Sequence, residues 1–147
     1  MSGLSFFEEY IKKGVVKRIK ADVERAKSLV NTSERKINSL KNQIEKLGVQ
    51  NENANDYIEY CHDILMLLIR AKMLTDGYSA SGQEAHKAEV AYLRNFKFNE
   101  ADIQFLDKLR FFRNGMLYYG TILDKEYAEK VIKFTKRISI KLREMLK

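Results

Sequence analysis

The chain has 147 residues, of which 45% are hydrophobic and 32% charged, with one cysteine and no proline. The length predicts a single domain, residues 1–147, and the lone cysteine excludes an internal disulfide and a cysteine-rich zinc site. The longest apolar run, residues 64–69, is far shorter than the ~20 residues of a membrane span, and residues 1–9 lack the basic segment of a secretory signal. Because proline stops helices and marks turns, its absence predicts an all-α fold. We also expect a cytoplasmic protein that makes no use of a membrane.

The net charge of +7 is concentrated towards the two ends of the sequence. Residues 1–48 carry 11 basic against 6 acidic residues, and residues 121–147 carry 8 against 4. A basic excess attracts nucleic acid at long range. The structural alternative is a solvated, lysine-rich helix face, which the same charges would also form.

The first predicted helix covers residues 19–47. Its apolar positions recur every three or four residues, which places them on one face of a helix, and Gly48 supplies the usual stop. A helix of this length would extend ~43 Å and needs partner helices for its stripe. The stripe consists of Ile19, Val23, Ala26, Val30, Ser33, Ile37, Leu40, Ile44 and Leu47.

Four more helices follow along the chain. The second, 54–76, is apolar over much of its circumference, which is typical of a central helix. The third begins at the Ser81-Gly82-Gln83-Glu84 capping box and reaches about residue 93. A fourth follows Asn99, and a fifth runs from about Asp124 to the C-terminus. Together they predict an up-and-down bundle of four main helices plus a shorter one.

Most patterns that mark catalysis are missing from the sequence. It contains no glycine-rich phosphate loop, no His-Glu-x-x-His and no paired Cys or His at metal-binding spacing, so we expect no metal and no cofactor. His62 and His86 fall on different predicted helices, and a structural hydrogen bond is the simplest role for each. Cys61 lies on the apolar stripe of its helix and is expected to pack without reacting.

The unusual stretch is residues 110–120, Arg-Phe-Phe-Arg-Asn-Gly-Met-Leu-Tyr-Tyr-Gly. Arg113 and Asn114 interrupt large apolar residues near the end of a helix. A half-buried arginine is rare unless it binds a carboxylate, a phosphate or backbone carbonyls. Arg110, Tyr118 and Tyr119 add a second cation, hydroxyls and stacking faces. The structural alternative is that Arg113 ties the helix end to an acidic neighbour such as Asp63.

These features together resemble the HEPN superfamily, helical domains of higher eukaryotes and prokaryotes associated with nucleotide binding. The resemblance covers most of the chain. It rests on the long first helix, on Asp76-Gly77-Tyr78, on His86 within residues 81–93, and above all on residues 105–110 leading into Arg113-Asn114. The opening stretch, residues 14–20, also looks like small archaeal members.

The resemblance implies a helical bundle that pairs into a homodimer. Catalytic members are metal-independent ribonucleases in which an Arg, often followed by a polar residue, precedes a His by about four to six residues. The Arg contacts the scissile phosphate and the His transfers protons. Many prokaryotic members are toxins encoded beside a nucleotidyltransferase antitoxin.

This sequence keeps the Arg and the Asn and has Tyr118 and Tyr119 where the His is expected. A phenol, with a reference pKa of about 10, is a poor general base at neutral pH, whereas imidazole at about 6.5 is well matched. The first hypothesis is therefore a non-catalytic domain that binds RNA, a nucleotide or a partner protein through Arg110, Arg113, Asn114, Tyr118 and Tyr119. The second is an active ribonuclease toxin in which Tyr118 or His86 replaces the missing His. The third is a structural subunit that binds a nucleotidyltransferase.

Overall fold

The computed structural model describes residues 3–147; Met1 and Ser2, the first two residues of the segment examined for a secretory signal, lie outside the described residues. Across that range the chain is mainly helical, as predicted, and no helix in it is long and apolar enough to cross a membrane. The elements in chain order are α1 (Phe7–Lys12), β1 (Val16–Arg18), α2 (Val23–Leu47), α3 (Ala54–Asp76), β2 (Tyr78–Ala80), α4 (Ala85–Tyr92), a 3-10 turn (Leu93–Asn95), α5 (Glu100–Tyr119) and α6 (Lys125–Met145).

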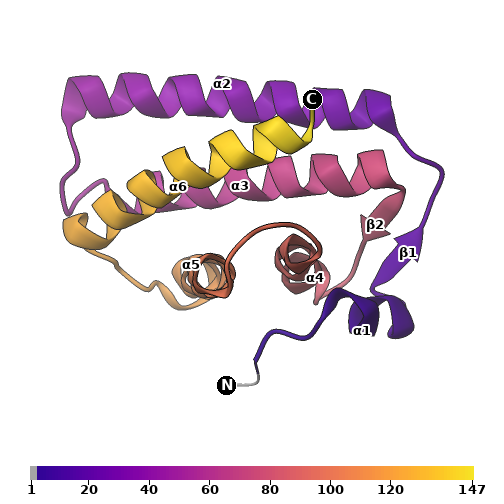
Figure 1. The fold of residues 1–147 in the computed structure, drawn as a ribbon. Coiled ribbons are helices and arrows are strands. Elements are labelled where there is room, and N and C mark those ends of the chain that lie inside the picture. The colour runs from indigo at the N-terminus through magenta and orange to yellow at the C-terminus, as the bar shows by residue number, and fades with distance from the viewer. Residues whose placement is uncertain (1–2) are drawn as a thin grey trace.

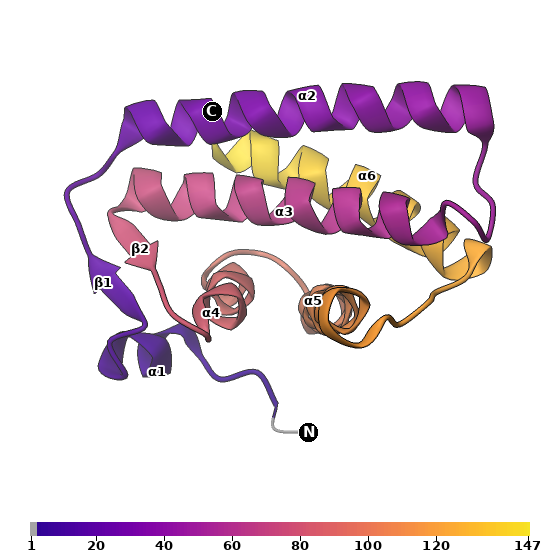
Figure 2. The same ribbon diagram turned by 180° about the vertical axis from the view of Figure 1, so that it is seen from behind.

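The helices form two layers that cross each other. Helices α2, α3 and α6 lie lengthwise in Figure 1, whereas α4 and α5 are seen nearly end-on beneath them, and Figure 2 shows the same crossing from behind. Helix α2 runs antiparallel to α3, but α3 and α6 start at the same side and run in the same direction. The up-and-down arrangement expected from the sequence is therefore wrong. The chain uses α4 and α5 as a crossing connection and does not fold them back alongside α3.

Helix α3 occupies the centre of the molecule, as its broad apolar surface predicted. Of its 23 residues, 13 are buried, and it packs against α2, α4, α5 and α6. One hydrophobic cluster joins these elements and reaches from Leu4 to Leu142. His62, a polar residue of α3, is consequently buried within this core.

Two predicted helix starts are confirmed by side-chain caps. The Asn99 amide oxygen accepts from the backbone N–H of Asp102 at 2.8 Å, and the Asp124 carboxylate accepts from that of Tyr127 at 2.9 Å. Such caps satisfy N–H groups that have no partner within the helix. They fix the starts of α5 and α6.

Two other helices start later than predicted because one strand of a small sheet precedes each of them. Strand β1 pairs antiparallel with β2, matching Val16 with Ala80 and Arg18 with Tyr78. The N–H of Ile19 continues this contact by donating to the Gly77 carbonyl at 2.9 Å, so α2 begins only at Val23. The Ser81 N–H donates to Val15 at 3.0 Å in the same way, and α4 begins at Ala85 without a side-chain cap. The predicted Ser81 capping box is therefore wrong.

Candidate functional site

Arg113 lies on α5 and faces the middle of α3. Its Nη2 is 3.6 Å from Asp63 Oδ1 and 3.9 Å from Glu59 Oε1, so it approaches two carboxylates without a hydrogen bond to either. Its side chain is only 21% exposed, and its Nε is buried with no hydrogen-bond partner among the described residues. The ion pair with Asp63 agrees with the tether considered from the sequence. The unsatisfied Nε shows that this tether leaves part of the guanidinium unused.

His62 lies near Arg113, and one nitrogen of its ring contacts the Asp63 carboxylate. Its Nδ1 is 3.0 Å from Asp63 Oδ1, and because an ionised carboxylate can only accept, Nδ1 carries the proton. Burial lowers the pKa of His62, despite the opposing effect of Asp63, so the ring is neutral at pH 7. Its Nε2 then presents a lone pair, which is buried and has no partner among residues 3–147.

The charge of Asp63 is retained by its neighbours. Burial alone would raise the pKa of this carboxyl, but the hydrogen bond from His62 and the charges of Arg113 and Lys36 hold it below its usual value. Asp63 therefore orients His62 and attracts Arg113 at the same time.

A second carboxylate–imidazole pair lies across from the first, on α4. His86 Nδ1 is 2.8 Å from Glu89 Oε1, and Arg70 of α3 binds the same carboxylate through Nε at 2.7 Å and Nη2 at 3.2 Å. Glu89 is 2% exposed, and although burial raises the pKa of its carboxyl, the hydrogen bonds from His86 and Arg70 bring it below the usual value. The structural hydrogen bond expected for His86 is made with this buried carboxylate.

The two pairs meet where α3, α4 and α5 converge. The rings of His62 and His86 have centroids 6.1 Å apart and are nearly perpendicular. We call this set the polar cluster: Glu59, His62, Asp63, Arg70, His86, Glu89 and Arg113. It offers two imidazoles, each oriented by a carboxylate, beside an arginine that has no hydrogen bond. Phosphate binding and proton transfer use groups of these types.

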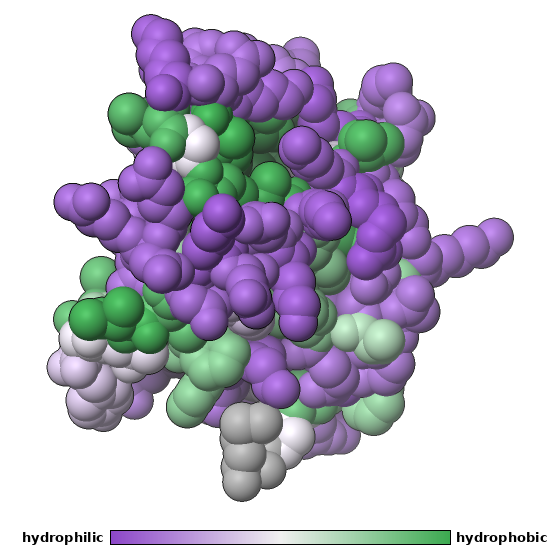
Figure 3. Space-filling view, turned by 90° about the vertical axis from the view of Figure 1, so that its left-hand side faces the viewer, coloured by the Kyte–Doolittle hydropathy of each residue, from purple (hydrophilic) through white to green (hydrophobic). Residues whose placement is uncertain are grey.

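The other residues proposed from the sequence lie apart from the polar cluster. Arg110 is buried and donates through Nε to Asp107 at 2.9 Å, which is a local structural contact. Asn114 is half-buried next to Arg113. Tyr118 and Tyr119 are 75% and 87% exposed at the end of α5, so within one copy of the chain they do not face Arg113 from inside a cleft. Nearby in sequence, Phe111, Leu117 and Ile122 are also exposed. Figure 3 views the side that holds the α5–α6 loop and shows hydrophobic groups there among hydrophilic ones.

Cys61 is inert, as expected. It is fully buried on α3, and burial raises the pKa of its thiol to about 11, so a thiolate does not form at neutral pH. The described residues also contain no group of three or more His, Cys, Asp or Glu that could hold a metal ion.

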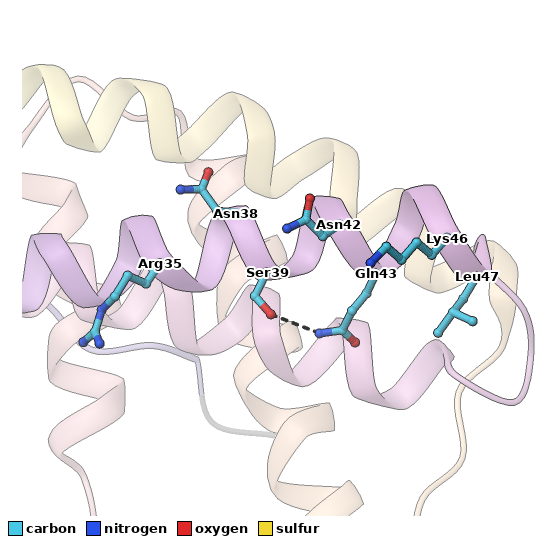
Figure 4. A pocket seen from close by; sticks show the side chains of 7 residues that line it. All are labelled: Arg35, Asn38, Ser39, Asn42, Gln43, Lys46 and Leu47. Atoms are coloured by element: carbon cyan, nitrogen blue, oxygen red, sulfur yellow. Dashed lines mark hydrogen bonds between the residues drawn. The ribbon is translucent and has the colours of Figure 1, made fainter.

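The hollow on the outer face of α2 is a poor candidate for a site. Figure 4 shows that all its lining side chains come from this one helix. Gln43 Nε2 donates to Ser39 Oγ at 3.2 Å, and none of the lining residues belongs to a second element. The lining residues are Arg35, Asn38, Ser39, Asn42, Gln43, Lys46 and Leu47.

The sequence analysis missed Glu59, Arg70 and Glu89. A signal for them exists: Glu59, Asp63 and Arg70 share a face of α3 at helical spacing, and His86 and Glu89 are three residues apart on α4. What the sequence does not show is that α4 crosses α3 at this level. In comparisons with known proteins, no family model, curated protein or solved structure matches the chain.

Proposed function

We propose that this chain is a HEPN-like domain that binds a phosphate-bearing ligand, RNA or a nucleotide, with Arg113 as the anchor. The observation that carries the proposal is that Arg113, with a side chain only 21% exposed, makes no hydrogen bond with any described residue. Buried donors are nearly always satisfied, so such a group indicates an absent acceptor. A phosphate oxygen matches the planar fork of a guanidinium.

The neighbouring carboxylates limit how the ligand approaches. Asp63 is fixed by His62 at 3.0 Å, whereas Glu59 is 41% exposed and contacts Arg113 only at 3.9 Å. The ligand therefore displaces Glu59 and leaves Asp63 in place. The exposed Tyr118 and Tyr119 at the end of the same helix provide stacking faces for a base. They are equally available to a second copy of the chain, as the proposed homodimer requires, or to a nucleotidyltransferase partner of toxin–antitoxin type.

The proposal is tested with a labelled RNA pool in EDTA, following binding and cleavage together. Arg113→Ala should abolish binding, while Lys108→Ala, which removes an exposed cation from the same helix, should change it less than about twofold. Arg113→Lys keeps the positive charge but lacks the planar set of N–H donors of a guanidinium, and it should bind RNA weakly. Unchanged RNA affinity in Arg113→Ala, together with a clearly lower melting temperature, would leave Arg113 as a structural tether only.

A second candidate function is metal-independent RNA cleavage, and the two carboxylate–imidazole pairs favour it. His86 has a side chain 44% exposed, and its Nε2 makes no hydrogen bond with residues 3–147, so it can meet a substrate. The His62 side chain is 3% exposed and acts only through Arg113 and Asp63. In this alternative His86 transfers the proton, and Tyr118 has no part in it. Cleavage in EDTA that is lost in His86→Gln and kept in Lys87→Ala would support it.

A further inference from the structure

A cavity lies where α3 is followed by β2 and α4, and Figure 1 shows these elements together at one end of the molecule. Its lining comes from α2, α3, β2 and α4, so four elements converge on it. The volume is about 210 Å³. That is smaller than the roughly 300–1,000 Å³ of sites that enclose whole drug-sized ligands. The cavity is therefore suited to a small group.

Two arginines outnumber the one carboxylate in the lining of this cavity. Arg25 from α2, Arg70 from α3 and His86 from α4 line it, against Glu89 as the one carboxylate among its lining residues. Arg18 lies next to the cavity with its Cζ 5.2 Å from the ring centre of Tyr78, which is also part of the lining. The excess of cationic groups over carboxylates favours an anion.

Donors remain free on both arginines. Arg70 uses Nε and Nη2 on Glu89, and its Nη1 has no partner among residues 3–147. The Arg25 side chain makes no hydrogen bond or ion pair within the same range, and neither does His86 Nε2. Ser79, another lining residue, adds a hydroxyl.

Glu89 makes this arrangement rigid. Its carboxylate, 2% exposed, is bonded to both Arg70 and His86, so both side chains are already oriented before a ligand arrives. A site whose donors are held in place loses less conformational entropy on binding. Without a ligand, the positive charge of Arg25 at the cavity is balanced only by solvent.

We propose that the cavity formed by Arg25, Arg70 and His86 binds a phosphate monoester group. The two guanidiniums and the Ser79 hydroxyl supply donors from three elements, which match the three terminal oxygens of a phosphate better than the two of a carboxylate. The group is either inorganic phosphate or the terminal phosphate of a nucleotide. The cavity shares Arg70, His86 and Glu89 with the polar cluster but not Arg113, so this proposal does not depend on the phosphate contact proposed there.

The test is a titration of ¹⁵N-labelled protein, in phosphate-free buffer, with inorganic phosphate and with adenosine 5′-monophosphate. We expect saturable shifts of the Ser79, Ala80 and His86 amides. Arg25→Gln should weaken binding at least tenfold, because it removes the one unpaired guanidinium. Arg35→Gln, which changes an exposed arginine farther along α2, should alter affinity less than twofold. Both changes are on the exposed surface of α2 and leave the core intact.

The remaining outcomes separate the sources of the ligand and the two sites. Tighter binding of the nucleotide than of phosphate would assign a nucleotide terminus, and equal affinities would assign the phosphate group alone. Arg113→Ala should leave these shifts unchanged, so the cavity is tested independently of Arg113. The absence of saturable shifts with both probes, or equal affinity in Arg25→Gln and the wild type, would overturn the proposal.

Discussion

Replacing Glu89 by Gln tests whether the buried carboxylate organises the polar cluster. The change keeps the shape of the side chain and removes the charge that Arg70 contacts at 2.7 and 3.2 Å. Removing one partner of a buried ion pair costs about 3–5 kcal/mol. The Arg70 side chain is 32% exposed and recovers part of its hydration, so we expect a loss of about 2–3 kcal/mol in the free energy of unfolding.

The matched control is Glu100→Gln. Glu100 accepts the same type of two-point contact, from Arg94 at 2.9 and 3.0 Å, but its side chain is 57% exposed. Exposed pairs contribute about 0–1 kcal/mol. Urea unfolding followed by circular dichroism measures both, and with a slope of about 1.5–2 kcal/mol per M the Glu89→Gln midpoint should fall by about 1–2 M. Equal midpoints for the two variants would refute the reasoning.

Three further predictions concern pH, the tyrosines and a helix cap. The pKa of His62 is lowered in the folded state, so the unfolded chain binds the proton more readily. The free energy of unfolding should therefore fall as the pH drops below about 6.5. In urea unfolding curves measured over a series of pH values, His62→Asn should remove this decrease. Tyr119→Ala should leave the melting temperature unchanged, because the side chain is 87% exposed, while weakening RNA binding in a filter assay; unaltered RNA affinity would remove the tyrosine from the proposed site. Asn99→Ala should lower the free energy of unfolding by about 1 kcal/mol through loss of the 2.8 Å cap, and no loss in urea unfolding would mean that another group caps α5.

The Glu89 carboxyl gives a pH effect of its own in the unfolding experiments. Its pKa is lowered in the folded state, so its contribution to stability is present above the unfolded value of about 4.3 and is lost as the pH falls through the lower, folded value. In Glu89→Gln the free energy of unfolding should therefore depend less on pH in the acidic range, below the pH range in which His62 is protonated.

The sequence predicted those parts of the fold that have a periodic or local signal. The caps at Asn99 and Asp124, the stop at Gly48 and the central position of α3 are such features. The sheet has no comparable signal, because strands of three residues show no periodicity and the pairing of Val16 with Ala80 joins distant parts of the chain. Because Ile19 continues the apolar spacing of α2, the predicted helix begins at residue 19, more than one turn before the observed start at Val23.

The candidate site was predicted only in part for a similar reason. Arg113 and its acidic neighbour Asp63 were named because each stands out in its own segment. The meeting of His62 with His86 depends on how α4 crosses α3, and neither residue signals the other in the sequence. Tyr118 and Tyr119 stand where the resemblance to the HEPN superfamily expects a His, but the end of α5 leaves both side chains exposed to solvent.

The most direct test of the central proposal observes the Arg113 Nε–H itself by ¹⁵N-resolved NMR during titration with a short RNA in EDTA. This N–H has no acceptor among the described residues. On RNA binding we predict a downfield shift and slower exchange with water, because a phosphate oxygen becomes its acceptor, with the Arg110 Nε–H, already bonded to Asp107, unchanged as an internal reference. Saturation of the protein with RNA while the Arg113 signal stays in place would contradict the proposal.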